Sequence, residues 1–501
     1  MMELMNARIG IGPISVFCGA SEYPFSDKNP FRLENLKHQQ EIEKFGKILA
    51  LAGIPLVWGA GQTGLMGAVS RSVIKHGGIA VGVSTQHLVS GKEGAQPGIT
   101  TLLIADSMQS RKMAFDKLSR AFVIFPGGIG TFDEVTEYLL QRENGEHEKP
   151  LVIVNIDGFY KPLLDYFDHL LERQYMTAEA RAMITVVERA EDILPAIIAE
   201  FDRHRKTSRG KRKVYKSSET LIGQHNQIIV RKHHSKMPIG RHNFPKGDLG
   251  AGSAALICGG IDAAMHDPRN AMHKKAVADL IKLLAQHQLP RLIHSGQTSG
   301  LKGLVGQLAR LHGLYDLGVS TRFLEEHGQV DHDAQTLLIA DNEQSAEFAI
   351  KNLVDAVIIG PGAIDSLEKL SDYLTEVDIK ESNQKLIIFN VDGHYDGLVE
   401  FFRYLVLRGY FAPAALDKLV IVKTAQEVID ALKRPTTSVD ASGLVTKADL
   451  VAVQGIKLIE TASTLQGEGT GTSYPRYVLT PENINKLMIN LGLAEAEPPA
   501  V

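Results

Sequence analysis

The strongest constraint on the fold is an internal repeat with a spacing of about 235 residues. The six residues Thr101–Asp106 recur letter for letter as Thr336–Asp341, and Asn155–Tyr160 recurs with two changes as Asn390–Tyr395. A chain of 501 residues is too long for one ordinary domain. The repeat therefore indicates a tandem duplication, with a first copy in the N-terminal half and a second copy in the C-terminal half.

Short apolar runs alternate with longer amphipathic stretches through residues 12–202. This alternation predicts strands and helices in turn, and hence a doubly wound parallel sheet that binds ligands at the carboxyl ends of its strands. The predicted fold class is α/β, with two Rossmann-like parallel-sheet domains in tandem and a short helical C-terminal tail. The predicted divisions are a first domain at 1–202, a basic linker at 203–250, a second domain at 251–434 and a C-terminal helical appendage at 435–501.

Charge is distributed unevenly along the chain. Residues 203–247 hold thirteen Lys and Arg residues against one acid, Glu219, which favours a solvated linker, with one short strand conceivable at 228–230. Nucleic-acid binding through 203–247 is a weaker alternative, because only Tyr215 and Phe244 are available to stack on bases. In the tail, Thr480–Glu482 has the pattern of a helix start.

Composition excludes several classes of protein. No apolar run reaches the roughly 18 residues that a membrane span requires, and the first residues lack the order of a signal peptide, so we expect a cytoplasmic protein without a membrane partner. Two cysteines, Cys18 and Cys258, are too few for a disulfide framework or a zinc cluster. We expect both to be buried small hydrophobes, and we predict no metal site.

A glycine-rich motif follows the apolar run 121–125. Residues Pro126–Glu134 read Pro-Gly-Gly-Ile-Gly-Thr-Phe-Asp-Glu, which predicts a strand, a turn that offers backbone amides to an anion, and a helix. A phosphate is the natural ligand of such a turn. The structural alternative is a capping box, in which Glu134 bonds back to the amide of Thr131.

Two further segments are expected at the same sheet edge. Residues 59–64 form a second glycine loop after an apolar run, and Arg111 with Lys112 stands near a predicted helix start. The loop fits a dinucleotide fingerprint, but the next predicted strand ends at Thr85 without the acidic residue that would hold a ribose. A mononucleotide therefore fits better than NAD.

The second copy lacks this chemistry while keeping the scaffold. Its glycine motif reads Pro361–Lys369, with Asp365 in place of the third motif glycine and Lys369 in place of Glu134. A carboxylate at position 365 would repel a phosphate. Glu368 lies one residue early, which turns a helical side chain by about 100°. We expect the second site to be inactive.

Four segments together resemble the Lonely guy (LOG) family of nucleoside 5'-monophosphate phosphoribohydrolases, which are often mislabelled lysine decarboxylases. These segments are Phe17–Ser21, Gly64–Gly67, Met108 with Arg111 and Lys112, and the complete motif 126–134. The resemblance covers about residues 12–200. It implies hydrolysis of the N-glycosidic bond of a nucleoside monophosphate to free base and ribose 5-phosphate. It implies no cofactor, and no lysine is singled out for the pyridoxal phosphate that a decarboxylase would need.

The resemblance also implies roles for individual residues. Arg111 and Glu134 match the catalytic pair: the arginine would clamp the ligand, and the glutamate would hold the ribose hydroxyls or a water. The phosphate and ribose would be held by Gly59, Gly61, Thr63, Gly64, Gly127, Gly128, Gly130 and Thr131. Lys112 would contact the phosphate or be an exposed helix-face lysine. Ala60 replaces a glycine that is usual in the family, which predicts weakened binding, and the preferred base is not readable.

Alternatives remain at two levels. Asp106 as a helix N-cap, and Asn155 and Tyr160 in a strand-end turn, have structural interpretations. The rival function is a non-catalytic nucleotide sensor or carrier. Family members generally form homodimers, so we expect a homo-oligomer or an internal pseudo-dimer in which the second copy takes the partner's place. The pseudo-dimer requires contacts between the copies beyond the linker.

Overall fold

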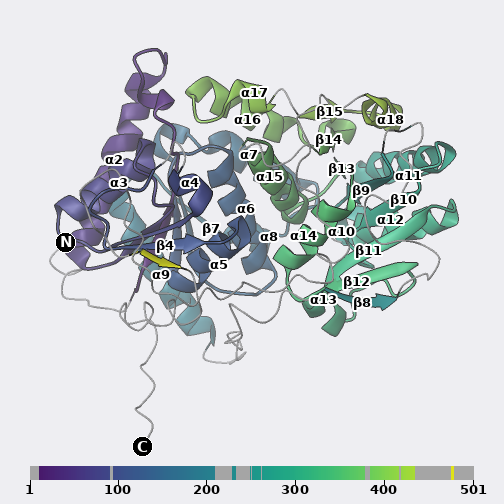
Figure 1. Cartoon of the computed structure of the whole chain (residues 1–501), viewed down its shortest axis with the longest axis horizontal. Coiled ribbons are helices and arrows are strands. Elements are labelled where there is room, and N and C mark those ends of the chain that lie inside the picture. Colours follow the sequence, from purple (N-terminus) through teal and green to yellow (C-terminus); the bar gives the residue numbers. More distant parts are fainter. Residues whose placement is uncertain are drawn as a thin grey trace, which may run out of the picture.

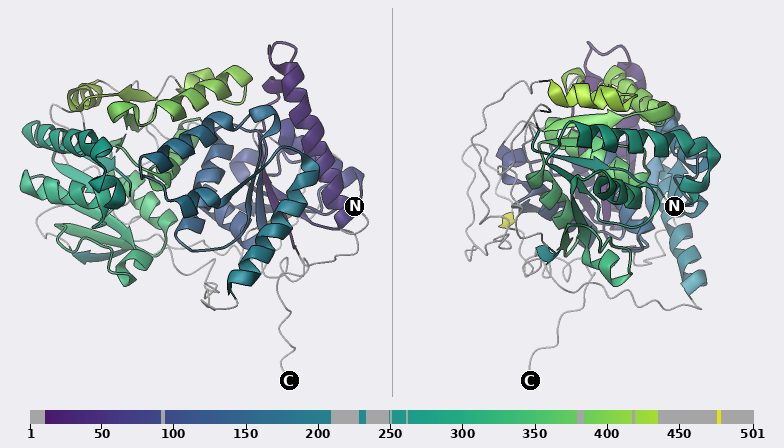
Figure 2. Two further views of the ribbon diagram at one scale, coloured as in Figure 1. Left: turned by 180° about the vertical axis from the view of Figure 1, so that it is seen from behind. Right: turned by 90° about the vertical axis from the view of Figure 1, so that its right-hand side faces the viewer.

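The chain forms two α/β domains, one from each copy of the repeat, and they lie side by side in Figures 1 and 2. The computed structural model describes residues 11–90, 94–208, 228–232, 249, 251–260, 262–378, 384–416, 419–434 and 476–478. None of the helices in these ranges is both long enough and apolar enough to cross a bilayer.

The first domain is built on an eight-stranded, fully parallel sheet with the order β16-β4-β3-β2-β1-β5-β6-β7. Its strands are β1 (Ile14–Phe17), β2 (Leu56–Trp58), β3 (Ala80–Thr85), β4 (Thr101–Ala105), β5 (Ala121–Ile124), β6 (Leu151–Val154), β7 (Ile184–Val187) and β16 (Arg476–Val478). Its α-helices are α2 (Arg32–Ala52), α3 (Gly64–Lys75), α4 (Gln86–Ser90), α5 (Met108–Leu118), α6 (Ile129–Glu143), α7 (Lys161–Glu172), α8 (Ala178–Ala182) and α9 (Ala190–Ser208). The strand order changes direction between β1 and β5, and ligands of such sheets bind where the loops diverge at this switch point.

The second domain repeats this plan, with the order β15-β14-β13-β9-β10-β11-β12-β8. Its strands are β8 (Ile228–Lys232), β9 (Ser253–Ile257), β10 (Arg291–His294), β11 (Tyr315–Thr321), β12 (Thr336–Ala340), β13 (Ala356–Ile359), β14 (Lys385–Phe389) and β15 (Val420–Val422). Its α-helices are α10 (Asp262–His266), α11 (Ala271–Gln286), α12 (Gly300–Leu311), α13 (Arg322–Glu326), α14 (Glu343–Leu353), α15 (Ile364–Asp378), α16 (Asp396–Arg408), α17 (Pro413–Leu416) and α18 (Ala425–Lys433). The predicted fold class is therefore confirmed for both copies.

Segments outside the two copies complete both sheets. The strand expected at 228–230 is present as β8, which pairs antiparallel with β12. The described part of the tail, 476–478, is a strand that pairs parallel with β4 and is drawn yellow in Figure 1. An edge strand has unpaired backbone groups, which explains why it can accept another strand. The helix pattern expected at 480–491 lies outside the described residues.

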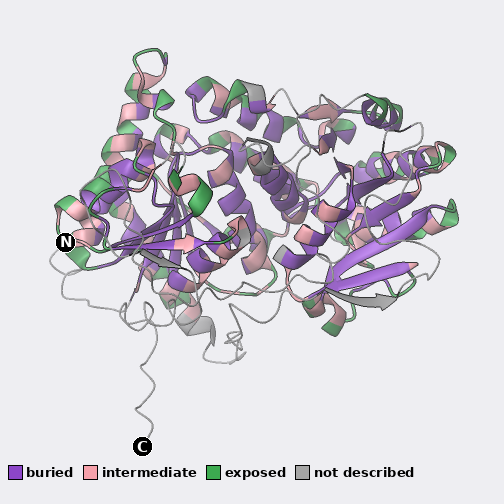
Figure 3. Ribbon diagram, viewed as in Figure 1, coloured by how far each residue is buried: buried purple, intermediate pink, exposed green. Residues whose placement is uncertain are grey.

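The strands and the inner helix faces are buried, as their purple colour in Figure 3 shows, and most of the buried side chains are apolar. In α7, Leu163, Phe167 and Leu170 are buried at intervals of three or four residues, so the helix presents one apolar face to the protein. Cys18 and Cys258 are both buried and both free, as predicted.

The two copies pack against each other through α6 with α15 and α7 with α16. Thr136 Oγ1 lies 2.8 Å from Ser371 Oγ, and these residues are equivalent in the repeat. Two further contacts exchange equivalent residues: His38 with Tyr410 at 2.9 Å, and His273 with Tyr175 at 2.7 Å. Such self-complementary exchange is the mark of a two-fold interface. The contacts that an internal pseudo-dimer requires are therefore present.

Candidate active site

Three sequence-predicted segments meet at the switch point of the first sheet. The backbone N–H of Gly19, after β1, donates to the carbonyl of Pro126 at 3.0 Å, and the N–H of Leu65 donates to the carbonyl of Gly19 at 2.9 Å. The loops 59–64 and 126–131 are thus joined through the turn after β1. This places both predicted glycine loops at one edge of the sheet.

The motif Pro126–Glu134 does not form a capping box. Helix α6 begins at Ile129 with Gly128 as its N-cap, so Thr131 and Glu134 both lie inside the helix. The helix begins early because Gly127 and Gly128 allow close packing: a Cβ at Gly127 would collide with Thr131 Oγ1, and a Cβ at Gly128 would collide with the carbonyl oxygen of Tyr410. The side chain of Glu134 is therefore available for a role other than capping.

The loop 59–64 packs closely on its neighbours. A Cβ at Gly59 would lie 2.6 Å from Arg111 Nη2, and Gly64 has a φ of 56° against the backbone of Gly19 to Ser21. Thr63 is the N-cap of α3, and its hydroxyl donates to the carbonyl of Ala20 at 2.7 Å. Gly61 is buried, and Trp58 Nε1 donates to its carbonyl at 3.4 Å. The hydroxyl of Thr63 thus holds loop 59–64 to the turn after β1.

Arg111 and Glu134 come from different helices, α5 and α6, and the charge of Arg111 acts on the Glu134 carboxyl. Arg111, on α5, donates through Nε to the carbonyl of Val83 at 3.1 Å and lies 5.2 Å from the ring centre of Phe115. Burial raises the pKa of Glu134 to about 8, against the opposing effect of the Arg111 guanidinium. Both side chains are buried. A fixed cation beside a carboxyl group that binds its proton tightly can clamp an anion and accept hydrogen bonds once ionised.

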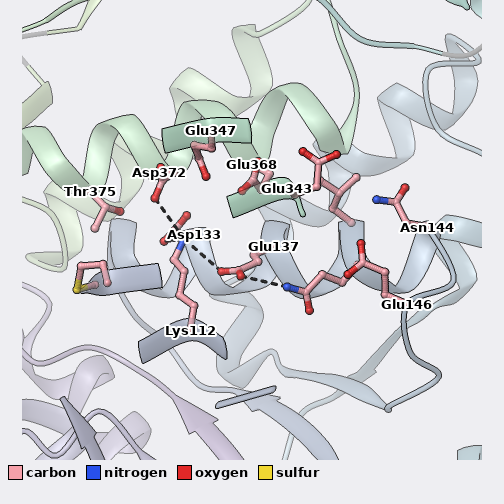
Figure 4. Close-up of a pocket in the computed structure, with 13 residues that line it drawn as sticks. Lys112, Asp133, Glu137, Asn144, Glu146, Glu343, Glu347, Glu368, Asp372 and Thr375 are labelled. Carbon is pink, nitrogen blue, oxygen red and sulfur yellow. Dashed lines mark hydrogen bonds and ion pairs between the residues drawn. The ribbon is translucent and has the colours of Figure 1, made fainter. Parts of the chain in front are cut away.

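Lys112 is neither exposed nor free for a ligand in this structure. Its Nζ pairs with Asp133 at 2.8 Å, with Glu137 at 3.2 Å and with Asp372 of the second copy at 3.3 Å (Figure 4). The alternative of an exposed helix-face lysine is therefore wrong, because the facing copy buries it. Its contact with a phosphate stays a prediction, and the described contacts make Lys112 part of the interface between the copies.

Three other predicted residues have structural contacts. The N-cap of α5 is Ser107, whose hydroxyl accepts from the N–H of Ser110 at 3.1 Å, so Asp106 as N-cap is wrong by one residue. Asn155 Oδ1 accepts from the N–H of Tyr160 at 2.7 Å, and the Tyr160 hydroxyl donates to the carbonyl of Phe125 at 2.7 Å. The turn interpretation of these two residues is confirmed.

The equivalent position in the second copy carries different charges. Asp365, in the first turn of α15, forms an ion pair with Lys302. Lys369, at the position of Glu134, pairs with Glu368 at 2.9 Å. Glu368 lines the pocket between the copies, so it faces the interface and does not replace Glu134. These contacts agree with the expected loss of the second site.

One residue at the first site escaped the sequence analysis. Tyr410 of the second copy packs its ring against Gly19, where a Cβ would lie 2.9 Å from Tyr410 Cδ1, and its carbonyl faces Gly128. The equivalent Tyr175 packs in the same way against Gly260 of the second copy. Each copy therefore contributes a tyrosine to the carboxyl edge of the other copy's sheet. The signal in the sequence was that Tyr175 and Tyr410 occupy equivalent positions of the repeat.

The fold and the site define a doubly wound α/β protein with two glycine loops at the carboxyl edge of its first sheet. A family model described as possible lysine decarboxylase matches residues 66–197 and 303–432. The cytokinin riboside 5'-monophosphate phosphoribohydrolase of Rhodococcoides fascians is 33% identical over 184 residues, which are 37% of this chain and 88% of that protein. The enzyme of the same name from Mycobacterium tuberculosis is 33% identical over 195 residues, 38% of this chain and 98% of that protein.

Among solved structures, the molybdenum cofactor binding protein of Rippkaea orientalis matches with a TM-score of 0.28 and 16% identity, over 38% of this chain and 98% of that one. The family model spans both copies, and the curated relatives match one domain-sized region. The chain therefore belongs to the LOG family, which is the family that the model described as possible lysine decarboxylase represents. It carries two copies of the family's domain.

Proposed function

We propose that the first copy hydrolyses the N-glycosidic bond of a nucleoside 5'-monophosphate to a free base and ribose 5-phosphate. The observation that carries this proposal is that Arg111 lies beside loop 59–64, while Glu134 follows loop 126–131 in α6 and its carboxyl feels the Arg111 charge. The names of the relatives support a nucleotide substrate. The second copy carries Ala346 and Lys369 at the positions of the pair, which supports one active site per chain.

The chemistry follows from the charges. The bond breaks through an oxocarbenium-like ribose, so the enzyme needs an anchored phosphate, a cation that holds the ligand and a carboxylate near the sugar. The amides of Gly127 to Thr131, at the start of α6, would hold the phosphate together with loop 59–64. Arg111 would clamp the nucleotide, and ionised Glu134 would accept from the ribose hydroxyls or from the attacking water.

The decisive experiment compares the parent chain with Glu134→Gln. Both proteins are incubated with AMP, GMP, CMP, UMP and an isopentenyl-adenine nucleotide, and release of base and ribose 5-phosphate is followed by chromatography. We expect release by the parent and a loss of at least about 100-fold in kcat/KM for the variant. Glu137→Gln is the matched control, because Glu137 is equally buried one turn further along α6 and lines the copy interface.

Two outcomes would contradict the proposal. Equal release by the parent and Glu134→Gln would remove Glu134 from the chemistry. Nucleotide binding by both proteins without release would favour the sensor or carrier function.

The domain boundaries at residues 202, 250 and 434 and the cytoplasmic location stay predictions from the sequence.

A further inference from the structure

The second copy has an open cleft at the carboxyl edge of its sheet, where the first copy has its candidate active site. The cleft has a volume of about 950 Å³, which is large enough for a nucleoside-sized ligand. Its walls come from both copies: Ser295, Ser320 and Asp365 from the second, and Tyr175 and Glu143 from the first. The proposed hydrolysis uses none of these residues.

The positions where this copy would hold a phosphate are occupied by its own carboxylates. Asp262 Oδ1 accepts from the N–H of Gly300, the first residue of α12, at 2.8 Å. Asp365 stands in the first turn of α15, where the first copy has Gly130, and pairs with Lys302. Across the cleft, burial and then Asp365 raise the pKa of Glu143 to about 7. A phosphate dianion would meet carboxylates at both helix starts, so the cleft suits a ligand without one.

The floor of the cleft has hydroxyl groups that lack partners. Ser320 is 2% exposed, and neither its Oγ nor that of Ser295 has a hydrogen-bond partner among the described residues. Buried polar groups in proteins are normally hydrogen-bonded, so an unsatisfied hydroxyl on a residue that lines a cleft indicates a position where a polar ligand can bind. Ribose hydroxyls and base amino groups both have the required donors and acceptors.

The mouth of the cleft has an exposed aromatic ring. Phe323, on α13, is 46% exposed, and its ring centre lies 4.2 Å from that of His327. The corresponding residue of the first copy is His87, so this apolar ring belongs to the second copy alone. An exposed ring beside a polar cavity offers a stacking surface for a planar base.

We propose that the second cleft binds a nucleoside that lacks a 5'-phosphate, with its base against Phe323 and its hydroxyls at Ser295 and Ser320. The cleft is then a second ligand site, distinct from the first in both location and charge requirement. The first copy would bind the phosphorylated form of one class of compound, and the second copy would bind the unphosphorylated form.

The test measures adenosine binding by calorimetry on the full chain carrying Arg111→Ala, which disables the first site. We expect one adenosine per chain, and binding at least about tenfold weaker after the additional change Phe323→Ala. Ser320→Ala should weaken binding about fivefold. Leu311→Ala is the control, because Leu311 is an exposed apolar residue at the far end of α12, and its loss should leave binding unchanged.

The charge requirement is tested in the same protein with AMP. We expect AMP to bind at least tenfold more weakly than adenosine, and Asp365→Gly to reduce that difference. The proposal is overturned by any of three results: no adenosine binding at millimolar concentration, AMP binding as tight as adenosine, or an unchanged affinity in Phe323→Ala. Because binding is read in a chain without a working first site, these failures are separate from failure of the proposed hydrolysis.

Discussion

At the scale of single residues, the candidate active site depends on glycines, whose lack of a Cβ atom lets other groups approach closely. Gly59 leaves room for the guanidinium of Arg111, and Gly128 leaves room for the carbonyl of Tyr410. A side chain at either position would displace a charged group or the facing copy. The glycines therefore set how closely the two loops approach the guanidinium of Arg111 and the carbonyl of Tyr410.

The ionisation of Glu134 predicts the pH dependence of activity. Burial raises the pKa of its carboxyl to about 8, so the group is mostly protonated at pH 7 in the free enzyme. The proposed role requires the carboxylate, and kcat/KM reports the free enzyme. We expect kcat/KM to rise about tenfold between pH 7 and pH 9, measured by initial rates of base release. A profile that is flat over this range would contradict the assigned role.

Ala60 gives a second prediction at this scale. It has a φ of 66°, a left-handed conformation that costs an alanine about 1 kcal/mol, and its equivalent in the second copy is Gly296 with a φ of 61°. We expect Ala60→Gly to lower the KM for the nucleotide while the melting temperature changes by less than about 2 °C, because relief of strain offsets the added freedom of the unfolded chain. A raised KM would show that the methyl group contributes to the site.

At the scale of elements, the pairing of α6 with α15 buries charge. Asp133 and Glu137 of α6 and Glu368 and Asp372 of α15 line one small pocket with Lys112 (Figure 4). Burial raises the pKa of Glu137 to about 7, against the attraction of Lys112. We therefore expect the stability of the interface between these two helices to depend on protonation.

The sign of this dependence follows from linkage. The pKa of Glu137 is higher in the folded chain than its unfolded value, so its contribution is fully present below about pH 4.5 and is lost as pH rises through 7. We expect Glu137→Gln to stabilise the chain relative to the parent by up to about 3 kcal/mol more at pH 8.5 than at pH 5. Thermal unfolding at both pH values measures this. Glu43→Gln, on the exposed side of α2, is the control, and a pH-independent effect of Glu137→Gln would refute the assignment.

The sequence predicted the elements better than their contacts. The strand and helix of the motif 121–134 were predictable because apolar runs and glycine turns are local signals. The start of α6 at Ile129 was not, because Gly128 packs against a carbonyl more than 280 residues away. The burial of Lys112 was equally hidden, since its carboxylate partners include Asp372 of the other copy. Site residues that depend on the facing copy have no local pattern.

At the scale of the whole molecule, the duplication has produced an interface with two-fold exchange whose two halves are not identical. Arg408 donates through Nη2 to Asn35 Oδ1 at 2.7 Å, and the equivalent Arg173 donates through Nε to Asn270 Oδ1 at 2.9 Å. Arg408 also lies near the rings of Phe31, Phe159 and Tyr404. The two halves of the interface therefore use the same arginine–asparagine contact, but Arg408 is more deeply buried than Arg173.

This difference is testable with a matched pair of substitutions. We expect Arg408→Ala to lower the free energy of unfolding by about 2–3 kcal/mol, because it leaves buried partners of a charged group unsatisfied. Arg173→Ala should cost about half as much, since its side chain is 13% exposed and already reaches water. Urea unfolding of both variants provides the comparison. An equal or larger loss for Arg173→Ala would show that the rings around Arg408 contribute little.

The strand β16 has a consequence for how the protein is made. It pairs with β4, which precedes it by about 370 residues. A ribosome that adds 5–20 residues per second needs on the order of 20–70 s to cover that interval. Throughout this time the nascent first domain has an open edge strand, which is the kind of surface that recruits other β-strands. Although its own strands β1 to β7 are synthesised first, the first sheet is completed only after the strands β8 to β15 of the second sheet have been made.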